Sequence, residues 1–539
     1  MKKLLPILLS LLLLCGCGAP AAPTVTETAP VRETAPVIHD SAEIPYVSRF
    51  DNETVIRLVD NGMDVTGTNS MSVVISHDII YYEDRNTYDS GNPYGEGTAS
   101  DKHTAAEAEK HLVINITKPG AYRITGQLSY GQIRVDLGED ACNDPNAVVE
   151  LILDNADLGC TVAPAVLFLN VYECDGNWSE DTAKPDVDTS AAGANLILQG
   201  NNTVTGAYVA KIFKDKAGEK KLWKQDGAIY SYMSMNVYGP GCLTLNAENE
   251  GLDTELHLTV NGGDITILSG NDGINTNEDN VSVTTINAGT LHIVAGLGEE
   301  GDGIDSNGYL VINGGTVISA AKPQSDAGLD SDLGSFIHGG TVVALGAAMD
   351  WAESDSQQVT MNLQFSHHQT ESLTVTDETG AAVFTFNPAA DPVLKEYGRT
   401  YQGLILSCPA FSVGDSYEIS VGGTKMMYTS TDVMGHPGRP GGQKPADMDL
   451  PDGFGGEIPT WGEGEIPTMP KDWQPSDGDR PDGPPEGEPG NMPTHPDGEP
   501  PARPNGGPHP GDEIPTGNGK TVFFMQDKVN FFSGITVAP

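Results

Sequence analysis

The sequence predicts an all-β protein: a parallel β-helix, a smaller C-terminal β module and a disordered Pro/Gly-rich segment. A strand motif that begins with glycine recurs at Gly241, Gly263, Gly289, Gly315 and Gly340, at spacings of 22, 26, 26 and 25 residues. Short β-branched runs divided by Gly, Asn and Asp fill residues 112–350, without a helix of useful length. Pro, Gly, Asp and Glu then crowd residues 435–519, and this composition cannot bury a core.

The first 45 residues predict export and anchoring. Met1, Lys2 and Lys3 precede an apolar run, Leu4 to Leu14, which is too short to span a bilayer and indicates a signal peptide over residues 1–17. Its end resembles a lipobox, with lipidation expected at Cys17 and a flexible tether over residues 18–45. The alternative is an ordinary signal peptide with incidental cysteines. We expect an extracellular protein that is lipid-anchored to the cell membrane.

Composition narrows the class of partner. The net charge is -46, from 29 basic and 75 acidic residues, so the protein repels nucleic acid and touches a membrane only through its anchor. No CxxC pair is present beyond the signal region, which makes a zinc site improbable. A bridge between Cys160 and Cys174 stays open, since the expected location is oxidising.

Changes in composition and in hydrophobic pattern divide the rest of the chain into regions. We predict an N-terminal β or cap region at 46–111, the β-helix at 112–350 and the C-terminal β module at 351–434. After the disordered linker at 435–519, residues 520–539 are apolar again. We expect this terminal strand or strands to return and pair with the module.

The repeats predict two inward columns and one polar ladder. Period-two alternation sends one column inward, Ile265, Leu291, Val317 and Val342, with a second column beside it, Ile267, Ile293, Ser319 and Ala344. One repeat cannot close a core alone, so successive repeats must stack about 4.8 Å apart. Asn261, Asn287 and Asn313 then form an asparagine ladder at a turn. A leucine-rich repeat is the rival, but its helical half is absent.

A second repeated motif carries the acidic residues. It reads Gly-Leu-Asp-Thr-Glu at 251–255 and recurs at 273–277, 303–307 and 328–332. Its apolar residues point inward, so its polar residues are expected to point outward in two columns. The expected calcium ligands are Asp253, Asn275, Asp305 and Asp330, with Asp272 and Asp302 in the turns. The expected glycan-facing column is Glu255, Asn277, Asn307 and Asp332.

Calcium is the predicted cofactor because stacked carboxylates repel unless a cation lies between them. Asp, Asn, carbonyls and water are ligands that calcium accepts, whereas zinc prefers His and Cys. The opposing interpretation is that Asp272-Gly273 and Asp302-Gly303 exist only to turn the chain. For the outward columns that interpretation is weaker, because Asp is a poor β-former.

Several blocks resemble a family of secreted bacterial carbohydrate-binding proteins. They are residues 114–126 (INITKPGAYRITG), 226–231 (DGAIYS), the Asn-Gly-Gly and Asp-Gly-Ile repeats, and, further on, 401–407 (YQGLILS) and 413–417 (VGDSY). The resemblance covers about residues 112–430. It implies a right-handed parallel β-helix, pectate-lyase-like in shape, with bound calcium. It also implies affinity for cellulose-like material and polygalacturonate without lyase activity. Where the family often carries Lys, this chain has Asp253 or Glu255, which makes this face more acidic.

The predicted function is therefore non-catalytic, calcium-dependent binding of polysaccharide, with the ion bridging protein and uronate carboxylates. The first alternative is a calcium-dependent polysaccharide lyase, for which Lys322 is the candidate base. A structural or adhesive surface protein is the second. The lysines from Lys211 to Lys224 are expected to form an exposed insertion, with Trp223 as a possible sugar-stacking residue.

Overall fold

The computed structural model describes residues 44–60, 62–82, 98–176, 179–180, 182–214, 221–347, 350–431 and 519–539. The predicted signal peptide, Cys17, nearly all of the tether and the Pro/Gly-rich segment lie outside these residues. In the described part of the chain, no helix is long and apolar enough to cross a membrane.

The described fold is all-β. An eight-stranded sheet contains β3 (Val73–Ser76), β4 (Leu112–Ile116), β6 (Gly131–Asp136), β8 (Val166–Asn170), β13 (Gly227–Ser231), β16 (Glu250–Thr254), β18 (Ile274–Thr276) and β20 (Ile304–Ser306). Its strands pair in parallel, except β3 with β4. The helical turns are short: α1 (Ala105–Ala108), α2 (Pro392–Glu396), η1 (Ser70–Ser72) and η2 (Ala141–Asn143).

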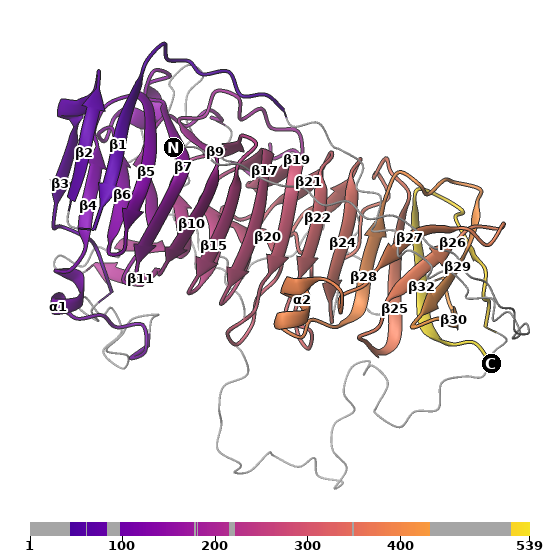
Figure 1. Cartoon of the computed structure of the whole chain (residues 1–539). Helices are drawn as coiled ribbons and strands as arrows, with labels where there is room; N and C mark the ends of the chain where they lie inside the picture. The colour runs from indigo at the N-terminus through magenta and orange to yellow at the C-terminus, as the bar shows by residue number, and fades with distance from the viewer. Residues whose placement is uncertain are drawn as a thin grey trace, which may run out of the picture. The chain divides into compact units, whose positions relative to one another are not determined.

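A second sheet of 22 strands begins with β1 (Glu53–Val59), β2 (Gly62–Gly67), β5 (Gly120–Leu128), β7 (Val149–Cys160), β9 (Ala194–Gln199), β10 (Asn201–Gly206), β14 (Met235–Tyr238) and β15 (Cys242–Ala247). It continues through β17 (Leu258–Ser269), β19 (Val283–Val294), β21 (Tyr309–Ile312), β22 (Thr316–Ala320), β23 (Gly334–Ile337) and β24 (Thr341–Gly346). Strands of successive repeats lie side by side (Figure 1) and pair in parallel from β15 through β17, β19 and β22 to β24.

The predicted inward columns are confirmed residue by residue. Ile265 pairs with Leu291, Leu291 with Val317, and Val317 with Val342. All members of both columns are fully buried. Burying one such aliphatic side chain stabilises the fold by about 1.5–3 kcal/mol, so the stacked columns supply much of the core energy.

The asparagine ladder is also confirmed. The Asn287 Nδ2 donates to Asn261 Oδ1, and Asn313 Nδ2 donates to Asn287 Oδ1, both at 2.9 Å. Gly289 and Gly315, two residues beyond these asparagines, have φ of 92° and 79°, in the region that favours glycine. The recurring Asn-Gly spacing thus encodes both the ladder and the turn beside it.

The C-terminal strands complete the second sheet. They are β25 (Thr360–Gln369), β26 (Leu373–Thr376), β27 (Ala382–Phe386), β28 (Tyr401–Ser407), β29 (Ser416–Val421), β30 (Thr424–Met427), β31 (Phe523–Phe524) and β32 (Val529–Val537). β32 pairs in parallel with β25, and β31 pairs with β29, which is the predicted return of the terminal segment. The buried Phe523, Phe532 and Ile535 pack in the core of this region.

The structure decides the open question of the Cys160–Cys174 bridge and corrects the expectation of exposure at Lys224. The cysteines of the described residues, including Cys160 and Cys174, are free thiols, so the possible bridge is not formed. The lysine-rich insertion forms a separate two-stranded sheet of β11 (Val209–Lys214) and β12 (Lys221–Gln225). Its last lysine, Lys224, is largely buried rather than exposed, because it bonds to the acidic residues described next. The side chain of Trp223 lies outside the described residues.

Candidate functional site

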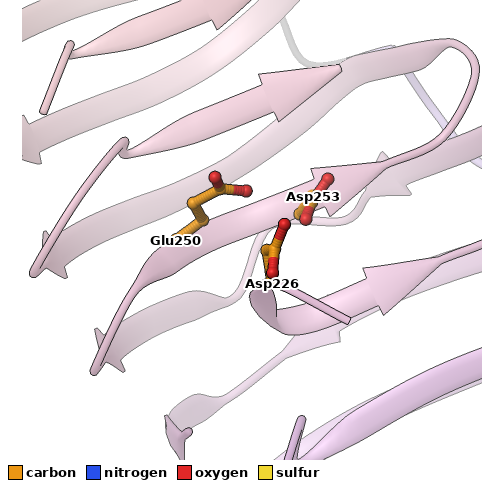
Figure 2. A group of neighbouring side chains, drawn as sticks. All are labelled: Asp226, Glu250 and Asp253. Carbon is orange, nitrogen blue, oxygen red and sulfur yellow. The ribbon is translucent and has the colours of Figure 1, made fainter. Parts of the chain in front are cut away.

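Three carboxylates converge at the centre of the eight-stranded sheet. Glu250 and Asp253 come from β16, and Asp226 comes from the turn that leads into β13 (Figure 2). One ligand oxygen from each lies within 4.8 Å of the others. The parallel pairing of β13 with β16 brings these residues together, although Asp226 and Asp253 are 27 positions apart.

Burial leaves part of this cluster without hydrogen-bond partners. Glu250 is 4% exposed and Asp253 is fully buried. Glu250 Oε2, Asp253 Oδ2 and the nearby Asn275 Oδ1 have no hydrogen-bond partner. An unpaired buried carboxylate oxygen costs several kcal/mol, so these atoms mark a place for a positive charge.

The electrostatics of the cluster agree with this reading. Burial, and then the charge of Asp226, raises the pKa of Glu250. Burial, and then the charge of Glu250, raises the pKa of Asp253 well above its usual range. The folded protein therefore resists ionising both groups unless a cation compensates them.

Lys224 supplies one positive charge to the same cluster. Its Nζ lies 2.8 Å from Asp226 Oδ2 and donates to Asn277 Oδ1 at 2.9 Å. Burial alone would lower the pKa of Lys224, but the charges of Asp226, Glu250, Glu255 and Asp253 raise it well above its usual range. One lysine does not balance four carboxylates, so the cluster keeps an excess negative charge.

Neighbouring polar groups enclose most of the cluster, although the side chains of Lys224 and Asp226 stay 18% and 14% exposed. The Tyr230 hydroxyl donates to Glu255, and Asn277 Nδ2 donates to Asp253 Oδ1. The Tyr232 hydroxyl donates to the main-chain oxygen of Lys224 at 3.1 Å, which ties β12 to β13. Tyr230, Asp253 and Asn275 occupy one row across β13, β16 and β18.

The expectation that both polar columns face solvent is wrong for their first members. Asp253 and Glu255 are fully buried, and Asn277 is 3% exposed, so Glu255 and Asn277 cannot contact a polymer. The reason is that Lys224, Tyr230 of β13 and Tyr232 in the turn after β13 lie against the columns here. Asn275 and Asp305 are each 6% exposed, whereas Asn307, Asp330 and Asp332 are partly exposed.

A second acidic group lies further along the columns. Burial, and then the charges of Asp330 and Asp305, raises the pKa of Asp302 to about 8. Burial, and then a hydrogen bond to Asp350, raises the pKa of Asp330 to about 8. Asp302, Asp305, Asp330 and Asp350 therefore lie close enough to influence one another's charge.

The turn aspartates also have a structural role. Asp272 Oδ1 accepts from the Asp302 amide at 2.7 Å, and Asp302 Oδ1 accepts from the Ala327 amide at 2.6 Å. Each side chain thereby fixes the turn of the next repeat. These two bonds support the turn-forming interpretation for both residues.

Sequence reasoning missed Asp226, Glu250 and Lys224. The available signal was the acidic residue directly before glycine, since Asp226-Gly227 and Glu250-Gly251 match Asp272-Gly273 and Asp302-Gly303. No sequence pattern indicated Lys224, because its contact with the carboxylates depends on where β12 lies relative to the repeats.

The donors of the cluster fit a hard divalent cation. Asp226, Glu250, Asp253 and Asn275 offer oxygen only, and no His or Cys belongs to the cluster. Calcium accepts six to eight oxygens in irregular geometry, whereas magnesium demands an octahedron and gives up water reluctantly. The cluster could therefore hold a metal ion, with these four side chains as ligands.

Lys322, the candidate lyase base, is engaged elsewhere. Its Nζ donates to the carbonyl oxygen of Gly298 at 2.7 Å and to that of Glu299. Lys322 thus secures the loop after β19.

A family model described as carbohydrate-binding domain-containing protein matches residues 110–380. A carbohydrate-binding domain-containing protein from Acetivibrio thermocellus is 29% identical over 155 residues. This match spans 29% of the chain and 44% of that relative's length. A solved structure of a polysaccharide lyase-like protein from C. thermocellum, a gadolinium derivative, aligns with 49% of this chain and 80% of its own. The identity is 22% and the TM-score 0.30.

Proposed function

Since the chain belongs to the family of carbohydrate-binding domain-containing proteins, we propose that it binds polysaccharide without cleaving it and that calcium supports this binding. The polysaccharide is of the plant type or acidic, either cellulose-like or polygalacturonate. From the expected lipid anchor at Cys17, we infer that this binding takes place at the cell surface.

The observation that carries the calcium part is the buried cluster with orphaned oxygens. Glu250 and Asp253 each bury one oxygen without a hydrogen-bond partner beside a third carboxylate. A divalent cation would neutralise the charge that Lys224 leaves unbalanced. Binding of the ion to the folded state alone then stabilises the fold.

The ion at this cluster has a structural role in the proposal. Glu250, Asp253 and Asn275 are buried and the Asp226 side chain is 14% exposed, so an ion here would stiffen the stack rather than touch sugar. A bridging ion needs partly open ligands, which Asn307, Asp330 and Asp332 offer among the column residues. The parallel β-helix, right-handed by resemblance, is the architecture that we propose for this stack.

The alternative function is a calcium-dependent lyase, and the two lysines argue against it. A base must reach the proton of a bound uronate. Lys224 is largely buried and bonded to Asp226 and Asn277, and Lys322 donates to loop carbonyls. The other alternative, a structural or adhesive surface protein, predicts no affinity for glycan.

The test compares purified residues 18–539 on polygalacturonate and on cellulose, in calcium and in excess chelator. We expect calcium-dependent retention without new absorbance from unsaturated uronides. The double variant Glu250→Gln/Asp253→Asn should lose the calcium response, whereas the exposed control Asp64→Asn should keep it. Rising absorbance that Lys224→Ala or Lys322→Ala removes would establish a lyase, and no retention on either glycan would contradict binding.

A further inference from the structure

A groove of about 560 Å³ lies over the asparagine ladder, on the other sheet from the acidic cluster. Its floor takes one polar side chain from each of five successive repeats: Tyr238, Asn261, Asn287, Asn313 and His338. They lie in or directly after strands that pair in parallel from β14 through β17, β19 and β21 to β23, with a register shift at Asn261 between β17 and β19. The floor is thus a regular row that runs along the direction of stacking.

The walls of the groove are held in place before any ligand arrives. Thr189 Oγ1 donates to Asn236 Oδ1 at 2.7 Å, and Asn236 Nδ2 donates back to the Thr189 carbonyl at 2.8 Å. The amide of Ile44, another lining residue, donates to the Asn261 carbonyl at 3.1 Å. The Tyr238 ring packs against Tyr46, with centroids 4.7 Å apart. Little ordering entropy remains to oppose binding at such a site.

The floor has hydrogen-bonding capacity that the ladder does not use. An asparagine amide has two donor hydrogens and an oxygen with two lone pairs. Each step of the ladder uses one donor and one acceptor. Beyond Asn313, the buried Nδ1 of His338 has no hydrogen-bond partner. Paired donors and acceptors at one spacing suit sugar hydroxyls, which both donate and accept.

The charge of the walls selects against anions. Asp186 and Asp188 line the groove, and no Lys or Arg is among the described residues that line it. The guanidinium of Arg49 lies beside the groove, where its Nη2 donates to the Ser190 carbonyl at 2.7 Å, so two carboxylates face one adjacent cation. A polyuronate would bring further carboxylates to this surface and be repelled, whereas an uncharged glycan would not.

We propose that this groove binds one extended chain of an uncharged, hydroxyl-rich polysaccharide along the asparagine ladder. Neighbouring strands lie about 4.8 Å apart, so Asn261 to Asn313 span ~10 Å, and successive amides meet successive sugars. The inference rests on the proposed carbohydrate-binding function and adds the contact surface and its preference for neutral glycan.

The test measures binding of soluble hydroxyethylcellulose and of polygalacturonate by affinity electrophoresis, in calcium, with the whole chain after residue 17. Asn313→Ala and His338→Ala should each weaken retention by hydroxyethylcellulose roughly 2- to 12-fold, as expected for one lost hydrogen bond. The exposed asparagine of β10 gives the matched control Asn201→Ala, which should bind as wild type. Asp186→Asn should increase retention by polygalacturonate.

The outcomes separate this inference from the proposed function. If wild type is retained and the groove variants are retained equally, the groove is not the site, although carbohydrate binding stands. If wild type is retained by polygalacturonate alone, the preference for neutral glycan is wrong. If wild type binds neither glycan, both proposals fail. The calcium shift of the melting temperature should be unchanged in Asn313→Ala and His338→Ala, which verifies that these variants fold.

Discussion

The substitution Asp253→Asn should raise the stability of the metal-free protein and reduce the stabilisation that calcium gives. It replaces one buried carboxylate of the cluster with an amide of nearly the same shape. Asp253 Oδ1 accepts from Asn277, and Oδ2 lies buried beside Glu250 without a hydrogen-bond partner. The variant therefore removes one charge from a group of four carboxylates and one lysine.

In chelator, the charge of Asp253 is a cost to the folded state. Its folded pKa is raised above the ordinary value of 3.8, by burial and then by Glu250. Such a group stabilises the fold fully below its unfolded pKa, and this stability is lost as pH rises through the folded pKa. Each pKa unit of elevation is worth about 1.4 kcal/mol at neutral pH. Metal-free Asp253→Asn should therefore melt above metal-free wild type at pH 7.

Calcium should stabilise wild type more than it stabilises the variant. An ion at 100 times its dissociation constant stabilises wild type by about 2.7 kcal/mol, and the variant has lost a charged ligand. Thermal unfolding of both proteins, in chelator and across a calcium titration, measures the two effects. A calcium shift in Asp253→Asn equal to that of wild type would refute the assignment of this ligand. A metal-free variant less stable than wild type would refute the electrostatic argument.

Four further predictions concern the core, the terminal strand, the lysine and pH. Leu291→Ala should lower the free energy of unfolding by about 2–5 kcal/mol in urea titration, since Leu291 is fully buried between Ile265 and Val317. Phe532→Ala should cost about 3–5 kcal/mol in the same assay, and a smaller loss would mean that β32 contributes little. Lys224→Met should raise calcium affinity by calorimetry roughly tenfold or more, because it removes a positive charge at ion-pair distance; unchanged affinity would contradict this. In chelator, the urea concentration at the unfolding midpoint should decrease as the pH rises from about 4 to about 8, which is the interval between the ordinary carboxyl pKa and the raised pKa of Asp302 and Asp330. A midpoint that does not change with pH would contradict this prediction.

The sequence predicts the columns well because their cause is local. Alternation with period two decides which face a residue takes, and the glycine spacing sets which residues pair. The sequence alone therefore assigns Leu291 to a core column and Asn287 to the asparagine ladder. Their structural partners are the ones expected from the repeat.

The depth of the acidic columns could not be predicted in the same way, because burial depends on what covers a face. The period-two pattern predicts that Asp253 and Glu255 point away from the apolar core, and neither side chain belongs to the hydrophobic cluster. Lys224 and the tyrosines of β13 and its following turn then enclose them, and these come from a different repeat. An insertion such as β11–β12 has no register with the repeats, so its contacts are not encoded in any spacing.

Burial of the cluster also bears on how an acidic protein meets its glycan. A chain of net charge -46 attracts neither a polyuronate nor any other polyanion by its long-range field. A calcium ion bound at Asp253, as proposed, would reduce that charge by two units and leave its sign unchanged. Recognition at the proposed groove must then come from short-range hydrogen bonds and packing, which favours an uncharged sugar chain. The two proposed sites thus have different roles: the ion at the acidic cluster stabilises the stacked strands, and the asparagine ladder contacts the polymer.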